Sequence, residues 1–522
     1  MVKMSLFTFF TLMGCSSENN IITPDTQVTK QNIIESDVQY RNLQKLCKVW
    51  GFAKYTHQSF LLGLKNWDQE LLNIIPVVYS ATEDEVNGIL YKWFIGLGDD
   101  GYASFDEESM LTSTDENRLR YMMDMEWLTE EYLGKPLVAV LSRFQGISDI
   151  DRSEAPVSFD QLNNSVHTKE KTYYNMDYSD IGYRLLGLFR MWNAMEYYYP
   201  YMDIVDDDWN ELLLEHIPMM LNETDKKSYE STLASLASKL DDAHVNLSGA
   251  SMRATNKRYI KAQSNNFIPS PKVSHVLLEN NIGLINPSKL RVGEIYDIMK
   301  KFADTNGLII DFRQYPSDFL PYSLGNYLVN ERHPFAICSA PSMVVPGVFA
   351  DGAPLYSGRM SEGDLEEVWQ AYLNFNKDEL KKIRASYLEY YDMDIGYSLE
   401  EFKEAYLKIV FGESYYYDKK VVLIMDETTI SQPEFTIMSL RNGANVTVIG
   451  RNSIGADGNV TSLPLPGRIS MTYTGLGIYY PDGGQTQRIG LSPDIYIERT
   501  AEDASECRDE LMEAAVQFIL GE

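Results

Sequence analysis

The stretch from residue 419 to residue 441, KKVVLIMDETTISQPEFTIMSLR, constrains the fold of this 522-residue chain most strongly. Its apolar run, residues 421–425, is continuous, β-branched and bounded by polar residues, which is typical of a buried strand in a parallel sheet. From Pro433 the apolar side chains follow a helical spacing, and proline suits a first helical turn because its missing N–H removes no hydrogen bond there. The pattern predicts a strand, a sharp turn and a helix.

Ser431 stands in that turn. A serine between a strand and the start of a helix is exposed, with free backbone N–H groups nearby that can stabilise an oxyanion. Glu434 is well placed beside the positive end of the helix dipole. Serine is also a favoured helix N-cap. This stretch alone therefore leaves two interpretations open, a nucleophile and a capping residue.

From about residue 280 strands alternate with helices, which predicts a layered α/β domain over 280–522. The expected strands are 281–285, 307–312, 421–425 and 446–449, and the expected helices are 292–302, 319–329 and 508–520. Residues 360–410 are charged and helical in period. We therefore expect a helical insertion at about 340–418.

The N-terminal half contains an internal repeat. Aligning Trp50 with Trp192 also brings Trp67 onto Trp209 and Pro76 onto Pro218 without a gap. Apolar residues in both copies keep a helical spacing, so each copy is expected to form a small helical bundle. The predicted layout is an N-terminal domain over 38–178 with the first copy and a possible strand at 137–141, a second copy over 179–250, and a connecting segment over 251–279.

His244 distinguishes the two copies. It ends the run Leu240-Asp241-Asp242-Ala243-His244, whereas the first copy has Tyr102 at the matching position. A histidine that the bundle required would be expected in both copies. The difference favours a chemical role for His244, although a solitary histidine can also be purely structural.

The charge and the cysteines exclude several classes of function. A net charge of −29 repels phosphate, and no basic cluster offsets it, so we expect no nucleic-acid partner. The four cysteines form no close pair and no metal-type spacing, and therefore indicate neither a disulfide framework nor a zinc site.

The first residues, MVKMSLFTFFTLMGC, combine one lysine, a short apolar run and Cys15. The run is too short for a permanent membrane span of roughly 30 Å. The segment resembles a bacterial lipoprotein signal, which implies removal of residues 1–14 and lipidation of Cys15. Such a chain would be tethered outside the cytoplasm, in the periplasm or at the cell surface, through a flexible segment over 15–37. An ordinary secretory signal is the alternative.

Several motifs together resemble the C-terminal processing (tail-specific) protease family over about 280–520. They are Ser431-Gln432-Pro433-Glu434, then Gly450 and Gly455, the strand with Asp311 and Arg313, and the late Gly490-Leu491-Ser492-Pro493-Asp494. The resemblance implies a crotonase-like or ClpP-like α/β core and a peptidase that needs no metal or other cofactor. It implies Ser431 as nucleophile and the backbone N–H of Gln432 as an oxyanion donor.

The chain departs from the family pattern at three positions. The bacterial processing enzymes carry a lysine base where this chain has Ala456, and no lysine follows Arg441. The tricorn-like branch uses an upstream histidine instead, which His244 resembles, and a supporting glutamate at the position of Gln487. That carboxylate is missing here or comes from elsewhere, such as Asp242 or Glu498.

The third departure is Pro316, which has no N–H to offer where relatives have glycines, so Ser317 is the candidate second oxyanion donor. The segment between His244 and residue 281 is also too short for the PDZ domain that many relatives contain. We therefore expect no PDZ domain.

The sequence thus predicts a lipid-anchored serine endopeptidase in which Ser431 attacks a peptide bond and His244 acts as general base. Asp242, Glu434 and Gln487 are candidate supporting residues. The alternative is an inactive protease-like lipoprotein that binds peptides or other ligands.

Overall fold

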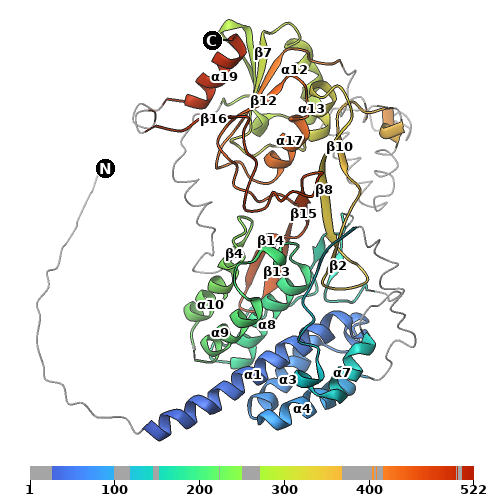
Figure 1. Ribbon diagram of the computed structural model, residues 1–522, viewed down its shortest axis with the longest axis vertical. Coiled ribbons are helices and arrows are strands. Elements are labelled where there is room, and N and C mark those ends of the chain that lie inside the picture. The colour runs from blue at the N-terminus through green and yellow to red at the C-terminus, as the bar shows by residue number, and fades with distance from the viewer. Residues whose placement is uncertain are drawn as a thin grey trace, which may run out of the picture.

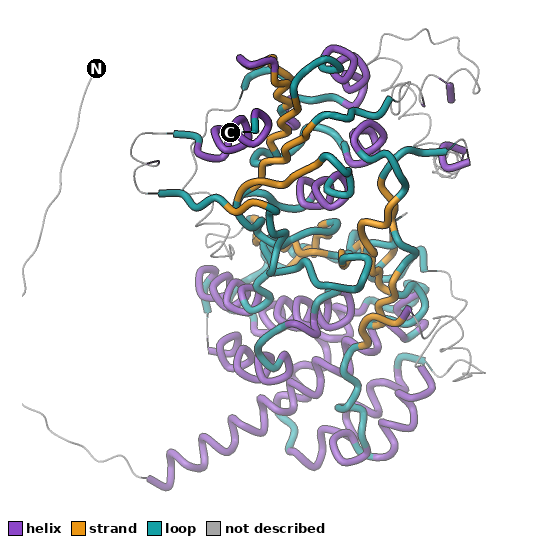
Figure 2. Tube along the Cα trace, turned by 45° about the horizontal axis from the view of Figure 1, so that its top comes forward, coloured by secondary structure: helices purple, strands orange, loops and turns teal. Residues whose placement is uncertain are grey.

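The computed structural model describes residues 26–98, 118–144, 152–160, 162–222, 224–249, 271–361, 363–366, 403, 404, 407, 415–500, 503 and 508–521. Helices gather in the N-terminal half and most strands in the C-terminal half (Figures 1 and 2). The helices of the N-terminal half are α1 (Thr26–Thr56), α2 (Gln58–Leu61), α3 (Trp67–Tyr79), α4 (Glu83–Gly96), α6 (Glu130–Leu133), α7 (Lys135–Leu141), α8 (Ile181–Tyr198), α9 (Trp209–Asn222) and α10 (Lys226–Ser238). None of the helices in the described ranges is long and apolar enough to span a bilayer.

The two copies of the repeat contain the same contact. The indole Nε1 of Trp50 in α1 donates to the carbonyl of Trp67 in α3 at 2.9 Å. The indole Nε1 of Trp192 in α8 donates to the carbonyl of Trp209 in α9 at 2.7 Å. α3 and α9 also each contain an internal proline, Pro76 and Pro218. A duplication requires matching contacts of this kind, and the duplication itself stays a prediction.

Two local predictions for this half were wrong. Residues 137–141 form the end of α7 and not a strand, because a short apolar run can be buried in either element. Gly134 at φ 78° and the early Pro136 set the start of this helix. Residues 26–37 belong to α1 and not to a flexible tether. Cys15 and Tyr102 lie outside the described residues.

The C-terminal half is built on a six-stranded sheet in the order β16-β12-β11-β7-β6-β5. All pairs are parallel except β5 with β6. The strands are β5 (His275–Leu278), β6 (Ile282–Ile285), β7 (Gly307–Asp311), β11 (Lys420–Met425), β12 (Val446–Gly450) and β16 (Ile495–Tyr496). The predicted α/β domain is therefore present. Its crotonase-like architecture and the absence of a PDZ domain stay predictions.

Helices cover both faces of this sheet. They are α12 (Ile295–Lys301), α13 (Pro321–Leu328) and α17 (Gln432–Leu440) on one face and α19 (Glu510–Leu520) on the other. Because side chains alternate along a strand, Leu423 of β11 packs with the first group while Val422 and Ile424 pack with α19. Burial on both faces explains why residues 421–425 are continuously apolar.

A second sheet forms beside this core. Its order is β1-β9-β8-β10, with β15 paired to β8. The strands are β1 (Leu119–Met122), β8 (His333–Pro341), β9 (Val348–Asp351), β10 (Leu355–Ser357) and β15 (Gly477–Tyr479). The described start of the expected insertion, residues 340–361, is thus strand and turn rather than helix. Its short runs of Val, Phe and Tyr favour strands.

A third sheet, in the order β13-β14-β4, joins the two halves of the chain. β13 (Val460–Leu465) and β14 (Ile469–Thr474) form a hairpin, and β14 pairs with β4 (Asn246–Ser248), which follows His244. Figure 1 places this hairpin beside α8. The guanidinium of Arg190 donates to the carbonyl of Pro464 at 2.9 Å, and the Tyr229 hydroxyl donates to that of Pro466 at 3.0 Å. The chain that follows Ser431 is therefore inserted into the half that carries His244. A small two-stranded sheet, β2 (Ser158–Phe159) with β3 (Ser165–Val166), lies in the same half.

Candidate active site

Ser431 occupies a strained turn between β11 and α17. Its backbone lies at φ 66° and ψ −126°, a region that non-glycine residues adopt only when the surrounding structure holds them there. Ser431 is the N-cap residue of α17 and forms a capping box with Glu434, but capping residues normally have an extended backbone, which Ser431 does not have. Between the two interpretations that the sequence leaves open, this geometry favours the nucleophile turn.

Glu434 holds this turn from inside the protein. Its buried carboxylate accepts the backbone N–H groups of Ser431 at 2.8 Å, Gly455 at 2.9 Å and Ala456 at 3.1 Å, and the Ser453 hydroxyl at 2.5 Å. Burial raises the pKa of Glu434, while these hydrogen bonds lower it. Glu434 therefore supports the turn rather than the reacting atoms.

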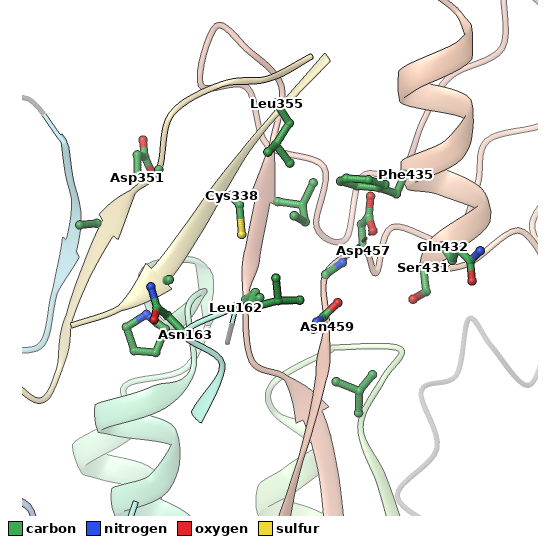
Figure 3. A pocket seen from close by; sticks show the side chains of 18 of the residues that line it. Leu162, Asn163, Cys338, Asp351, Leu355, Ser431, Gln432, Phe435, Asp457 and Asn459 are labelled. Carbon is green, nitrogen blue, oxygen red and sulfur yellow. Dashed lines mark hydrogen bonds between the residues drawn. The ribbon is translucent and has the colours of Figure 1, made fainter. Parts of the chain in front are cut away.

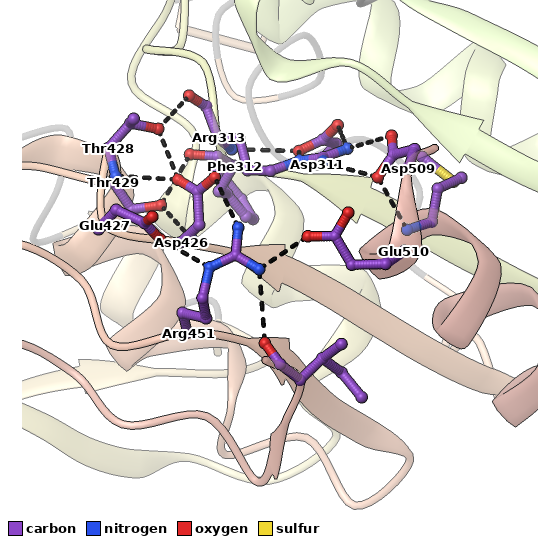
Figure 4. A network of polar contacts seen from close by, with 12 residues as sticks. Asp311, Phe312, Arg313, Asp426, Glu427, Thr428, Thr429, Arg451, Asp509 and Glu510 are labelled. Carbon is purple, nitrogen blue, oxygen red and sulfur yellow. Dashed lines mark hydrogen bonds and ion pairs between the residues drawn. The ribbon is translucent and has the colours of Figure 1, made fainter. Parts of the chain in front are cut away.

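The loop before Ser431 is fixed by a polar network at the carboxyl ends of the strands (Figure 4). Arg313 pairs with Asp311 at 2.7 Å and with Asp509 at 2.8 Å, which joins β7 to the start of α19. Arg451 pairs with Glu427 at 2.7 Å. The ion pairs anchor the strand ends from which the turn emerges. They give a structural reason for the Asp311 and Arg313 motif.

The oxyanion donors are only partly as expected. Gln432 is the first residue of α17, where backbone N–H groups have no partner within the helix. Its side-chain amide donates to the carbonyl of Asp318, in the loop after β7. The structure contradicts the prediction that the backbone N–H of Ser317 is a second oxyanion donor. Its backbone N–H donates to the carbonyl of Pro287 at 3.0 Å and its hydroxyl to that of Leu290 at 2.5 Å, so this N–H is already used.

His244 lies in the loop between α10 and β4 and is attached to β14. Its Nδ1 lies 2.8 Å from the Thr474 hydroxyl, and its carbonyl accepts the Thr472 hydroxyl at 2.8 Å. Asp242 accepts the backbone N–H of His244 at 2.9 Å and that of Thr474 at 2.9 Å. Burial lowers the pKa of His244 and the charge of Asp242 partly opposes this, so the ring is neutral near pH 7.

A cavity of about 1230 Å³ opens beside Ser431. Figure 3 shows Ser431 and Gln432 on one side of it, with Asp457 and Asn459 between them and Cys338. The wall is mainly apolar, and contributors from both halves of the chain include Leu162, Phe319, Tyr322, Leu355, Phe435, Leu476 and Ile478. An apolar, partly enclosed space of this kind is suited to the side chains of a bound ligand.

Thr474, which is hydrogen-bonded to His244, lies directly behind this wall of the cavity. A Cβ on Gly458, which lines the cavity, would lie 3.1 Å from the methyl carbon of Thr474. Among the described residues, however, no hydrogen bond joins His244 to Ser431. Ser431 thus lines the cavity directly, while His244 is linked to the cavity wall through Thr474.

Asp457 is a cavity residue that the sequence analysis missed. Its side chain is 3 % exposed, one oxygen accepts the N–H of Gly458 at 2.7 Å, and the other has no partner among the described residues. Burial first, and then the charge of Glu434, raises the pKa of Asp457 well above its usual range. Because Glu434 accepts four hydrogen bonds and Asp457 only one, a proton is more stable on Asp457 than on Glu434. In the sequence, the one sign of a functional role for Asp457 was its place in a loop flanked by glycines.

Gln487 does not take the role of the family glutamate. Its side chain is fully buried, and neither amide atom forms a hydrogen bond of normal geometry with a described residue. Its amide lies beside the Tyr199 hydroxyl. Burial and then the charge of Asp242 raise the pKa of Tyr199, while a side-chain hydrogen-bond interaction with Gln487 lowers it. Gln487 is thus close to the His244 loop without bonding the ring. Glu498 is exposed at the end of β16.

Comparison with models of protein families gives a match over part of the chain. Residues 363–497 match the model of peptidase family S41 and include Ser431, Glu434 and Gln487 but not His244. No curated protein sequence matches the chain.

Three solved structures show a similarity at low sequence identity. A peptidase from Parabacteroides merdae is 16 % identical (TM-score 0.48; 66 % of this chain and 97 % of that one). CPAF in complex with lactacystin is 13 % identical (TM-score 0.41; 66 % and 99 %). The photosystem II D1 C-terminal processing protease is 12 % identical (TM-score 0.33; 64 % and 98 %). The family expected from the sequence is confirmed by the model match, and the chain carries a serine-peptidase domain of family S41.

Proposed function

We propose that this protein is a serine endopeptidase in which Ser431 is the nucleophile and His244 the general base. The observation that carries the proposal is the strained backbone of Ser431 at the edge of a large apolar cavity. The family match, which includes this residue, supports the same role.

In the proposed reaction the Ser431 hydroxyl attacks the peptide carbonyl, and His244 Nε2 takes its proton. The backbone N–H of Gln432 stabilises the oxyanion. His244 then returns the proton to the leaving amine, and water hydrolyses the acyl-enzyme. The hydrogen bond between Ser431 and His244 forms when substrate binds, since such bonds are often long in a resting enzyme.

The cavity suggests the class of substrate. Aromatic and aliphatic side chains such as Phe319, Phe435 and Ile478 favour peptides with bulky apolar residues near the scissile bond. Cleavage of a peptide blocked at both ends would establish endopeptidase activity. Cleavage that needs a free C-terminus would instead indicate tail-specific action.

We also propose that Cys15 is lipidated and holds the protein at a bacterial membrane, outside the cytoplasm. The motif before Cys15 supports this proposal. Mass spectrometry of the N-terminal peptide would show a mature chain that begins with acylated Cys15. An unmodified cysteine at an internal position would exclude lipidation.

The second candidate function is an inactive protease-like protein that binds peptides. Ala456 in place of a lysine and Gln487 in place of a glutamate favour it. Labelling with a fluorophosphonate, which reacts with activated serines, separates the two functions. Wild type, Ser431→Ala, His244→Ala and the exposed control Ser492→Ala should be compared.

We expect labelling of the wild type and of Ser492→Ala, none of Ser431→Ala, and a rate reduced at least about 100-fold in His244→Ala. If all four proteins label alike, Ser431 is not the reactive serine. If none is labelled but the wild type binds peptides, the binding function is correct.

A further inference from the structure

We propose that the Thr474 hydroxyl is the positioning partner of His244, in place of the carboxylate expected at position 487. This inference rests on the proposed role of His244 as a base and adds the missing third member of the catalytic group. Nothing in the sequence pairs these two residues, which are 230 positions apart.

Thr474 and His244 are joined by a closed set of hydrogen bonds. The Thr474 hydroxyl lies 2.8 Å from Nδ1 of the ring. The Thr474 N–H donates to one oxygen of Asp242 at 2.9 Å, and the other oxygen accepts the His244 N–H at 2.9 Å. Thr474 is fully buried at the end of β14. Both the ring and its backbone are therefore fixed to one strand.

The other candidates for this role are occupied or do not bond the ring. Both oxygens of Asp242 bind backbone N–H groups. The amide of Gln487 lies beside Tyr199 and forms no hydrogen bond with the imidazole of His244. Within the part of the chain that the structure describes, Thr474 is the one side chain that hydrogen-bonds the imidazole.

The bond to Nδ1 determines what the ring can do. A neutral imidazole carries its proton on one nitrogen and accepts on the other. When the Thr474 oxygen accepts a hydrogen bond from Nδ1–H, the lone pair of Nε2 is free to take the proton of Ser431. A hydroxyl can also donate, so it orients the ring but holds this tautomer less firmly than a carboxylate does. Thr474 also supplies no negative charge to stabilise the imidazolium.

Two measurements test the proposal on the full-length protein. The first is the His244 tautomer, read from ¹⁵N shifts of histidine-labelled protein and assigned with His244→Ala among six histidines. The second is the separation of kcat from KM for a blocked peptide. Thr474→Val removes the hydroxyl at constant size, and Thr474→Ser keeps it. Thr472→Val is the matched control for the tautomer, because its hydroxyl bonds the carbonyl of His244 and not the ring.

We expect Nδ1–H in the wild type, Thr474→Ser and Thr472→Val, and a shift towards Nε2–H in Thr474→Val. We expect kcat of Thr474→Val to fall roughly 100-fold with KM unchanged, and Thr474→Ser to retain most of it. An unchanged tautomer in Thr474→Val, or equal losses in the valine and serine variants, would overturn the proposal.

Failure of this proposal is distinguishable from failure of the proposed function. If Ser431 is not labelled by a fluorophosphonate, the peptidase function is wrong, while the ¹⁵N measurement still decides whether Thr474 positions the ring. If Thr474→Val does not fold, Thr474→Ala removes the same hydroxyl and is judged by the same two results.

Discussion

The backbone conformation of Ser431 is one that glycine adopts without strain. We therefore expect Ser431→Gly to be more stable than Ser431→Ala by about 1–2 kcal/mol, although neither variant can form an acyl-enzyme. Urea unfolding of the two variants measures the difference. Equal free energies of unfolding would mean that the turn is not strained.

Glu434 is expected to be sensitive to the loss of a single acceptor atom. Glutamine has one acceptor oxygen, so in Glu434→Gln its NH₂ group would face N–H groups that now bind the carboxylate. We expect a loss of about 2–4 kcal/mol in the free energy of unfolding and slower fluorophosphonate labelling of Ser431. The exposed Glu513→Gln removes the same charge and should cost less than about 0.5 kcal/mol. Similar effects of both substitutions would contradict this role of Glu434.

For single residues, the sequence singled out as candidates those that stand in recognisable local patterns. Ser431 follows a strand, and His244 stands out because the repeat lacks it in the first copy. Thr474 and Asp457 could not be found in this way, since their roles depend on neighbours distant in the sequence. Ser317 was wrong because the acceptor of its N–H, the carbonyl of Pro287, is known only from the fold.

Between elements, a buried group of charges holds the helical half together. Arg190 of α8 pairs with Asp68 of α3 at 2.7 Å and with Glu170 at 3.0 Å, and Lys54 of α1 also pairs with Glu170. All four side chains are almost completely buried. Removing one partner from such a group leaves an uncompensated charge.

We expect Arg190→Met to lower the free energy of unfolding by about 3–5 kcal/mol. The control Lys169→Met breaks an exposed pair with Glu154 and should cost less than about 1 kcal/mol. Urea unfolding of both variants measures the contrast. Comparable losses would mean that the buried pairs do not stabilise α1, α3 and α8 as a group.

Elements were predictable where their burial leaves an unambiguous pattern. The strands at 307–311 and 420–425 are buried on both faces and read as continuous apolar runs. The strands β8, β9 and β10 were missed because each mixes buried with partly exposed residues, and β8 also contains two prolines. Residues 137–141 are too few for their period to distinguish a helix from a strand.

For the whole molecule, buried histidines predict a loss of stability in acid. Burial lowers the pKa of His57 to about 4 and that of His167 to about 3. Between the ordinary value near 6.5 and these values the unfolded chain binds more protons than the folded one. The two neutral histidines therefore make their full contribution to the free energy of unfolding above about pH 6.5, and this contribution is lost as the pH falls below that value.

From the difference between the pKa of His167 in the unfolded and the folded chain, we expect the free energy of unfolding to fall by about 2 kcal/mol when the pH is lowered from 7 to 5. His167→Gln should show a correspondingly smaller change over the same interval, because glutamine does not titrate. Denaturant unfolding at the two pH values, for wild type and variant, measures it. An identical pH dependence would show that His167 is not the group responsible.

The sequence predicts a division into two halves, since the repeat ends near residue 250 and strands begin to alternate with helices near 280. It does not predict the return of the hairpin β13–β14 into the helical half. Its pairing with β4 is a contact between residues far apart in the chain, and neither strand indicates its partner by composition.

The hairpin β13–β14 also determines when the site can assemble during synthesis of the chain. A ribosome makes His244 long before Ser431, and β14, which carries Thr474, later still. A growing chain therefore has no assembled site until nearly all of it has been synthesised and its hairpin has docked between the helices. Under the proposed function, a molecule truncated before residue 474 would be unable to hydrolyse peptides even though it contains both Ser431 and His244.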